Sequence, residues 1–134
     1  MKTIIFSKDA DLDLESDVLL LPEEVEVADK QIIVYNDASS DNSLNILENY
    51  KNNYPNLFFI YNNTQNIGPT KNIEKAIKAC SGDIIILADQ DDYWQNNKVN
   101  KMVKFFDQNP KINGIFTNGF IMNSLEKIDK KYLI

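Results

Sequence analysis

The chain has 134 residues, 43% of them apolar and 25% charged, as expected for a globular domain with a core of its own. Its net charge of −6 provides no basic surface for a nucleic acid or an anionic lipid, so neither is an expected partner. All 14 basic residues are lysines and there is one cysteine, which excludes histidine-based catalysis, histidine metal ligands, arginine clamps and internal disulfides.

The first 30 residues begin with a segment typical of a strand. MKTIIFS (1–7) predicts this strand, whereas the acidic and leucine-containing residues after it show no clear helical or alternating period. No basic region precedes a long apolar run, and no apolar run reaches the length of a membrane span. We therefore expect a cytoplasmic protein that meets the inner face of the membrane only through partners.

A strand and a helix follow. QIIVY (31–35) is a short apolar run rich in β-branched residues, which predicts a strand. Leu44 and Leu47 then recur at helical spacing, and the predicted helix ends before Pro55.

A second strand and a second helix come next. NLFFIY (56–61) predicts a strand, and the next helix carries Ile73, Ala76, Ile77 and Cys80 on one face. The position of Cys80 on this apolar face indicates a buried structural thiol.

The last elements complete an alternating pattern. DIIILA (83–88) is a continuous apolar run, which predicts a strand buried on both faces. Val99 and Phe106 lie in a further predicted helix, and GIFTNGFIM (114–122) predicts one or two strands. Strands that alternate with helices over short connections predict an α/β fold, an open and mostly parallel sheet with flanking helices.

Polar clusters follow two of the predicted strands. Residues 36–41 (NDASSD) come after the first and residues 89–92 (DQDD) after the other, and both ends should meet at one edge of the sheet, where open α/β sheets bind ligands. Asp89 and Asp91 would point the same way in an extended segment. Because no arginine or histidine is available to separate them, a hard cation such as Mg²⁺ or Mn²⁺ is the economical partner.

Each cluster also has a purely structural interpretation. Asp92 could cap a helix that opens near residues 93–96, and residues 36–41 could be a turn whose side chains bond free backbone N–H groups. Two clusters at one sheet edge favour a site over two unrelated turns.

The segment TQNIGPTKN (64–72) adds a third polar element. Gly68 permits a tight turn, the helix start after it favours an anion, and Lys71 could approach a phosphate there. Helix capping plus one solvated lysine is the simpler alternative. Tyr93 and Trp94 are more typical of a wall, although an aromatic ring beside a sugar site would be useful.

These segments together resemble a known family. IIVYNDASSDNSLNIL, NNTQNIGPTKNIEKAIKACSGDIIILADQDDYWQNNKV and GIFTNGFIMNSLEKI are similar to the nucleotide-sugar half of family 2 glycosyltransferases, in particular the bacterial rhamnosyltransferase-like branch. The resemblance covers residues 31–128. It implies the GT-A fold, a Rossmann-like α/β sandwich.

The resemblance also implies roles for single residues. Asp37 would read the nucleobase, Asp89 would lie near the ribose, and Asp91 would hold the metal that bridges the diphosphate. The donor-binding residues implied or expected are Asp37, Ser39, Asn66, Gly68, Lys71, Asn72, Asp89 and Gln90, and the metal ligands are Asp89, Asp91 and Asp92.

The activity implied is an inverting glycosyl transfer in surface polysaccharide synthesis. A UDP- or dTDP-sugar would be the donor, Mg²⁺ or Mn²⁺ the cofactor, and a saccharide or a lipid-linked sugar the acceptor. Two other functions remain open: a non-catalytic nucleotide-binding or partner-docking module on the same fold, and a metal-dependent phosphoryl or nucleotidyl transferase, for which no glycine-rich phosphate loop is present.

The chain departs from the family at both ends. Residues 1–30 lack the Pro-x-Tyr-Asn turn that follows the first strand in the family, and the catalytic base and acceptor-binding half would lie beyond Ile134. We therefore expect one donor-binding domain over residues 1–134, either a truncated protein or a degenerate gene product. We also predict a homodimer through exposed apolar residues, namely Phe116, Phe120, Ile121 and Leu133.

Overall fold

The fold is described from a computed structural model of the whole chain, which describes residues 2–8, 30–89, 92, 94–122 and 128–132. The chain is divided into two compact units, residues 1–99 and residues 100–134. The sequence predicts a single domain, and the two units are described separately below.

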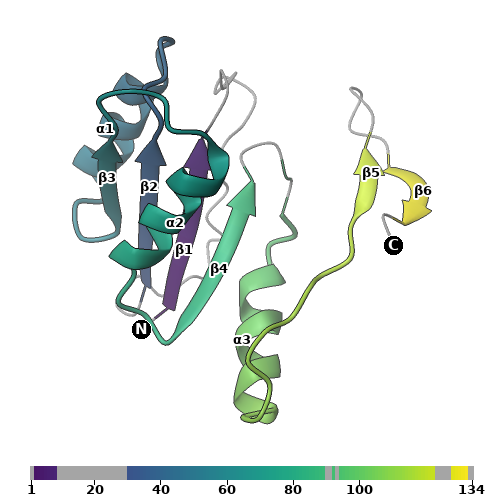
Figure 1. The fold of residues 1–134 in the computed structure, drawn as a ribbon. Helices are drawn as coiled ribbons and strands as arrows, with labels where there is room; N and C mark the ends of the chain where they lie inside the picture. Colours follow the sequence, from purple (N-terminus) through teal and green to yellow (C-terminus); the bar gives the residue numbers. More distant parts are fainter. Residues whose placement is uncertain (1, 9–29, 90–91, 93, 123–127, 133–134) are drawn as a thin grey trace. The chain divides into compact units, whose positions relative to one another are not determined.

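The first unit contains a four-stranded parallel sheet of order β3-β2-β1-β4 (Figure 1). The strands are β1 (Lys2–Lys8), β2 (Lys30–Asn36), β3 (Phe58–Asn62) and β4 (Ile84–Asp89). The open, parallel α/β architecture predicted from the alternating pattern is confirmed. The expectations for residues 9–29 lie outside the described residues.

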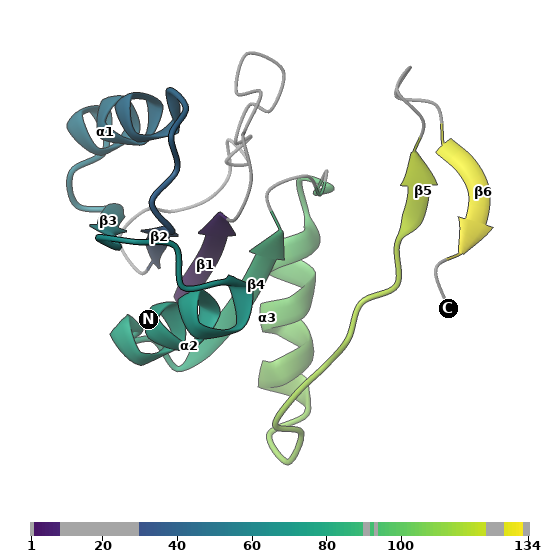
Figure 2. The same cartoon turned by 45° about the horizontal axis from the view of Figure 1, so that its top comes forward.

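Two helices lie on opposite faces of this sheet (Figure 2). Helix α1 (Ser43–Asn53) packs on β3, where Tyr50 stacks on the buried Phe58 with ring centroids 5.5 Å apart. Helix α2 (Pro69–Ala79) lies over β2 and β1, where Ala76 packs on Ile33. Because side chains alternate along a strand, neighbouring residues of β2 supply both cores.

Cys80 follows the last turn of α2 and is half-buried against the core formed by Ile33 and Ala76. Its thiol donates to the carbonyl oxygen of Ala76 at 3.1 Å, and burial raises its pKa. The sequence predicts a buried structural thiol, and the structure finds Cys80 packed on this core but only half-buried.

The prediction that β4 is buried on both faces is wrong for the residues that the structure describes. Ile85 is 41% exposed and Leu87 is 54% exposed, whereas Ile86 is buried. The reason is topological: β4 is the outer strand of the described sheet, and α2 covers β1 and β2 instead.

The second unit contains most of α3 (Lys98–Gln108) and an antiparallel pair, β5 (Phe120–Met122) with β6 (Ile128–Tyr132). The segment 114–122 therefore gives one short strand, preceded by extended chain. Within the described parts of the chain, no helix is both long and apolar enough to cross a membrane.

Candidate functional site

The direction in which successive strands are added to the sheet reverses at the central strand β1. The chain proceeds outward from β1 through β2 to β3, and α2 then returns it to β4 on the other side of β1. Ser7 of β1 is paired in register with Tyr35 on one side and with Asp89 on the other. The carboxyl ends of β2 and β4 thus flank the end of β1, at the kind of switch point where parallel sheets bind ligands.

Asp37 directly follows β2 and is 2% exposed. Its carboxylate accepts hydrogen bonds from the backbone N–H of Ile67 at 3.0 Å, from that of Gly68 at 2.8 Å, and from the side-chain amide of Asn63 at 2.7 Å. One buried carboxylate therefore fixes the loop that leads into α2.

These bonds also determine the charge of Asp37. Burial is the largest single influence and acts to raise its pKa, but the donors on Ile67, Asn63 and Gly68, with the charge of Lys75, together hold the pKa below its ordinary value. The group is therefore a fixed negative charge at the sheet edge.

The loop before α2 has a backbone that requires glycine. Gly68 has φ 83° and ψ 161° and stands at the N-cap of α2, followed by Pro69 in the first turn. Its N–H also lies 3.1 Å from Oδ1 of the exposed Asn66. Lys71 projects from the first turn of α2 and is exposed. Asn66 and Lys71 thus border the loop that Asp37 holds.

Asn72 lies beneath this loop and is fully buried. Its Nδ2 donates to the carbonyl oxygen of Tyr35 and its Oδ1 accepts from Asn63, both at 2.8 Å. Asn63 therefore joins Asn72 to Asp37, and sequence reasoning missed it. The only signal was its place in the NN pair that ends the strand before the loop.

Part of the polar cluster at residues 36–41 is a turn whose side chains bond backbone N–H groups, as the structural interpretation of this segment predicts. Asn36 Oδ1 accepts from the backbone N–H of Ser39 at 3.3 Å, and Asp41 Oδ1 accepts from that of Ser43 at 3.0 Å, near the start of α1. Ala38 adopts a left-handed conformation with φ 58°, which turns the chain just after Asp37.

At the end of β4, Asp89 and Asp92 are both exposed, and the N–H of Asp92 lies 3.4 Å from the carbonyl oxygen of Asp89. Helix α3 begins only at Lys98, so Asp92 is not its cap. Gln90, Asp91 and Tyr93 lie outside the described residues. Among those described, no group of three acidic or cysteine side chains could hold a metal ion.

Sequence reasoning missed Lys98, which lies near these aspartates. Its ammonium is 4.0 Å from the centroid of the Trp94 ring, a cation–π contact. Burial lowers its pKa, while the charges of Asp92 and Asp89 act in the opposite direction. The absence of arginine and histidine therefore does not leave the aspartates without a cation from the chain itself.

The arrangement of strands and helices is that of known glycosyltransferases. S. aureus TarS superposes with a TM-score of 0.71 at 21% identity, over 89% of this chain and 24% of that one. The mannosyltransferase PcManGT from Pyrobaculum calidifontis, solved with GDP-Man and Mn²⁺, superposes with a TM-score of 0.70 at 17% identity, over 78% of this chain and 32% of that one. The predicted GT-A fold is confirmed.

The sequence model of Glycosyl transferase family 2 matches residues 18–131, and the chain belongs to this family. It is 35% identical over 81 residues to the poly(ribitol-phosphate) beta-glucosyltransferase of Bacillus spizizenii, which is 60% of this chain and 13% of that protein. It is 28% identical over 106 residues to the poly-beta-1,6-N-acetyl-D-glucosamine synthase of Staphylococcus epidermidis, which is 79% of this chain and 25% of that protein. The chain thus spans a quarter or less of these relatives.

Proposed function

We propose that this chain binds a nucleotide-diphosphate sugar at the carboxyl ends of β2 and β4, for inverting glycosyl transfer in surface polysaccharide synthesis. The observation that carries the proposal is the placement of Asp37 and Asp89 on the two sides of β1, at the switch point of a family 2 fold. The solved complexes of TarS with UDP-GlcNAc and of PcManGT with GDP-Man support a nucleotide sugar as the donor.

The proposed residues are those named from the sequence. Donor binding is assigned to Asp37, Ser39, Asn66, Gly68, Lys71, Asn72, Asp89 and Gln90, and metal binding to Asp89, Asp91 and Asp92. Asp37 and Asn72 are buried and bonded to protein atoms, so they would act mainly by fixing the loop. Asn66 and Lys71 are exposed beside that loop, and in this proposal they meet the nucleotide directly.

The donor atoms at the end of β4 fit a hard divalent cation. Asp89 and Asp92 present exposed carboxylates, and Mg²⁺ commonly needs only one or two of these when substrate phosphates and water complete its shell. Mg²⁺ or Mn²⁺ bound there would supply positive charge for the departing nucleoside diphosphate. Lys98 adds a second positive charge beside the same carboxylates.

The acceptor in this proposal is a saccharide or a lipid-linked sugar, and the protein meets the membrane through partners. The chain's own residues bind and orient the donor. The residue that removes the proton from the acceptor hydroxyl is not among those assigned here.

Calorimetric titration of UDP and of dTDP tests the proposal. Binding should require Mn²⁺, disappear in EDTA, and weaken by about tenfold or more in Asp91→Ala, since one metal ligand is removed. The exposed Asp107 on α3 provides the matched control, Asp107→Ala, which should bind as the unchanged protein does. Equal binding with and without metal, or by the Asp91 variant, would contradict the proposed site.

A further inference from the structure

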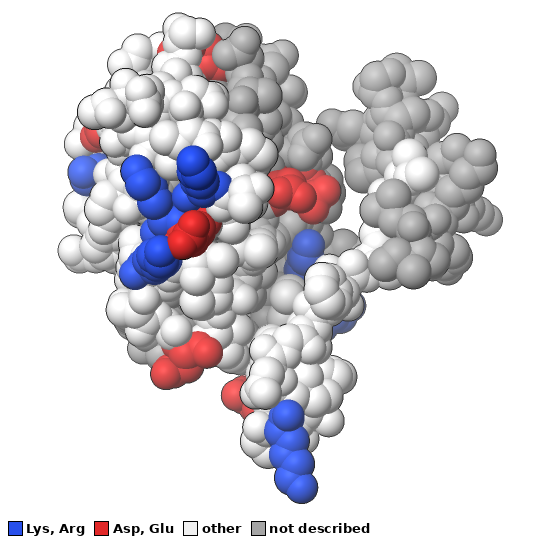
Figure 3. Space-filling model, in the orientation of Figure 1, with Lys and Arg blue, Asp and Glu red and all other residues white. Residues whose placement is uncertain are grey.

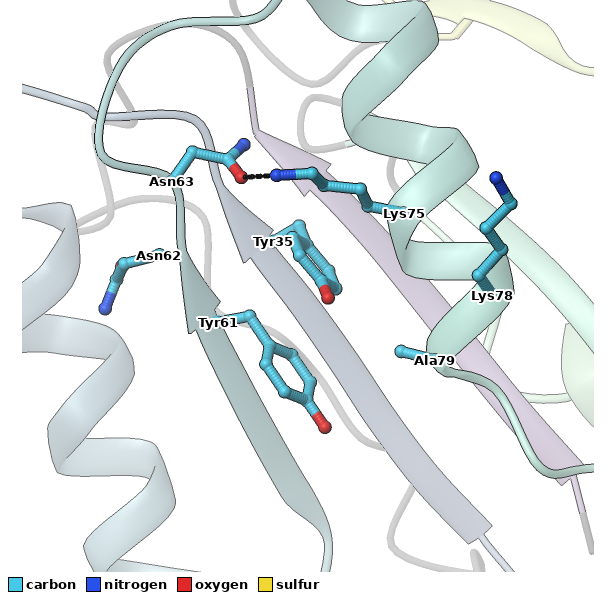
Figure 4. Close-up of a pocket in the computed structure, with 7 residues that line it drawn as sticks. All are labelled: Tyr35, Tyr61, Asn62, Asn63, Lys75, Lys78 and Ala79. Carbon is cyan, nitrogen blue, oxygen red and sulfur yellow. Dashed lines mark hydrogen bonds between the residues drawn. The ribbon is translucent and has the colours of Figure 1, made fainter.

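A hollow of about 420 Å³ opens on the α2 face of the sheet, beside the outer strand β3 (Figure 4). This volume is within the range of sites that hold small ligands. Its lining consists of Tyr35, Tyr61, Asn62, Asn63, Lys75, Lys78 and Ala79. The two tyrosine rings and the side chains of Asn63 and Lys75 lie close together there, whereas the side chains of Asn62 and Lys78 point away (Figure 4).

The tyrosine rings form one wall of this hollow. Tyr35 and Tyr61 are paired in register on β2 and β3, and their rings stack with centroids 4.8 Å apart and planes 15° apart. Tyr61 remains 40% exposed because no further strand of the described sheet lies beyond β3. An accessible aromatic face attracts polarised C–H groups, such as those on the apolar side of a sugar ring, through its negative quadrupole.

The hydroxyl of Tyr35 is protonated at neutral pH, as for any ordinary tyrosine, and burial together with the nearby Tyr61 raises its pKa further. It is therefore a neutral group able both to donate and to accept a hydrogen bond. The wall thus offers flat apolar surface and a hydroxyl in the same place, which suits a sugar better than a purely apolar ligand.

The other wall is positively charged. Lys75 reaches from α2 to Asn63 Oδ1 at 2.7 Å, and its ammonium has two further N–H groups to offer (Figure 4). Lys78 follows on the same helix and is paired with Glu74. With Lys71, three lysines and one glutamate lie on the exposed surface of α2, although the chain as a whole carries −6 (Figure 3). A local excess of positive charge favours an anionic ligand.

The hollow borders the Asp37 side of the proposed nucleotide site and lies away from its Asp89 side. Tyr61 is on β3 and Asp89 is on β4, the two outer strands of the four-stranded sheet. Three strand spacings separate these strands, roughly 14 Å. Asn63 joins the two regions, since its Oδ1 accepts from Lys75 while its Nδ2 donates to Asp37.

We propose that this hollow is a second binding site, for a saccharide that carries a phosphate or a carboxylate. The sugar ring lies against the exposed face of Tyr61, and the anionic group is bound by Lys75. This site does not depend on nucleotide or metal binding at the ends of β2 and β4.

Chemical-shift mapping by NMR, with glucose 6-phosphate as the probe, tests this site in the absence of metal and nucleotide. The shifts should centre on Asn63, Lys75 and Tyr61. Glucose and inorganic phosphate should each bind about tenfold more weakly, since each lacks one half of the recognition. Glucuronate serves as a further probe. It should bind if the site accepts any anionic sugar, and it should not bind if the site is restricted to sugar phosphates.

Three variants and one control locate the binding. Tyr61→Ala should weaken binding of glucose 6-phosphate by about tenfold, as should Lys75→Met, the effect of one lost charge-assisted contact. Lys78→Met should weaken binding less than Lys75→Met does, because the Lys78 ammonium is paired with Glu74. Lys51→Met, on α1 at the opposite face of the sheet, should leave binding unchanged.

The proposal is overturned if no shifts appear around the hollow, which would leave the tyrosine stack as a strand-pairing contact alone. It is also overturned if inorganic phosphate binds as tightly as the sugar phosphate, or if the Tyr61 and Lys75 variants bind unchanged. Because the titration contains no metal or nucleotide, these outcomes are independent of those for the donor site.

Discussion

At Asp37, one side chain links the end of a strand to the start of a helix. Its carboxylate receives bonds from Ile67, Gly68 and Asn63, which lie 26 to 31 residues further along the chain. Because the carboxylate is buried and its donors are half-buried, water would replace it only in part. The stability of this end of the sheet therefore depends on the charged carboxylate of Asp37. A turn at the surface would not need such a group.

Replacing Asp37 tests this dependence. Asp37→Ala should lower the free energy of unfolding by about 3 kcal/mol, because three half-buried donors lose a charged acceptor. Urea unfolding followed by circular dichroism measures the loss. Asp107→Ala, a change of the same kind at an exposed site on α3, should stay within about 0.5 kcal/mol. Equal effects of the two substitutions would show that the loop does not rely on Asp37.

The same carboxylate predicts a dependence of stability on pH. Its pKa in the folded chain lies below the ordinary value of 3.8, so the folded state favours the charged form. The stability that it contributes is complete above the unfolded pKa and is lost as the pH falls through the folded pKa.

Urea midpoints measured from neutral pH downward check this dependence. The midpoint of the unchanged protein should fall more steeply below pH ~4 than that of Asp37→Asn, and the two curves should approach each other in acid. NMR titration of the Asp37 carboxyl carbon provides a direct reading. A midpoint for that signal at or above the ordinary pKa would contradict the prediction.

Single residues also show what the sequence can predict. The position of Asp37 at a strand end follows from the pattern of the strands, but its partners do not, since they come together only in the fold. Lys98 was overlooked for a different reason. The composition excludes arginine and histidine as partners of the aspartates, and nothing in the sequence marks a lysine several residues after Asp92 as their partner. Only the structure shows that Lys98 lies over Trp94.

Among the elements, the sequence predicted those with a clear period well. The segments 31–35 and 83–88 became β2 and β4, and the apolar face of Ala76 marked α2. The prediction failed at β4 because an apolar run indicates a strand but does not indicate its neighbours. Sheet order and helix coverage are properties of the topology, so Ile85 and Leu87 could not be placed in advance.

The start of α2 depends on the backbone conformation of Gly68. With φ 83° and ψ 161°, it occupies a region that other residues rarely adopt, and a Cβ there would meet no atom within 4 Å. Gly68→Ala should therefore cost about 1–2 kcal/mol of stability through the backbone alone, without a steric clash. Urea unfolding measures the change.

Gly114→Ala is the matched control for this substitution. Gly114 also has open space around its Cα, but it lacks a positive φ. Its replacement should change the stability by less than about 0.5 kcal/mol. A Gly68 variant as stable as the unchanged protein would mean that the loop can adopt another conformation without loss.

At the scale of the whole molecule, charge and apolar surface are unevenly distributed. Lysines gather on α2, whereas Asp89 and Asp92 are exposed at the end of β4, and both features are set by the fold and not by the composition. The exposure predicted for Phe116, Phe120 and Ile121 is confirmed at 99%, 45% and 43%. Leu133 lies outside the described residues.

This apolar surface predicts self-association, because exposed aromatic and branched side chains gain free energy when a second copy covers them. Sedimentation velocity from micromolar to millimolar concentration should show a rising mean mass. Phe116→Ser should weaken the association by about tenfold or more, since burial of one phenylalanine contributes about 1.5–3 kcal/mol. Thr117→Ser, at the exposed neighbouring position, should leave it unchanged. A monomer at every concentration would refute the prediction. An association that survives Phe116→Ser would place the contact on another surface. Ile85 and Leu87 would then be the next residues to replace.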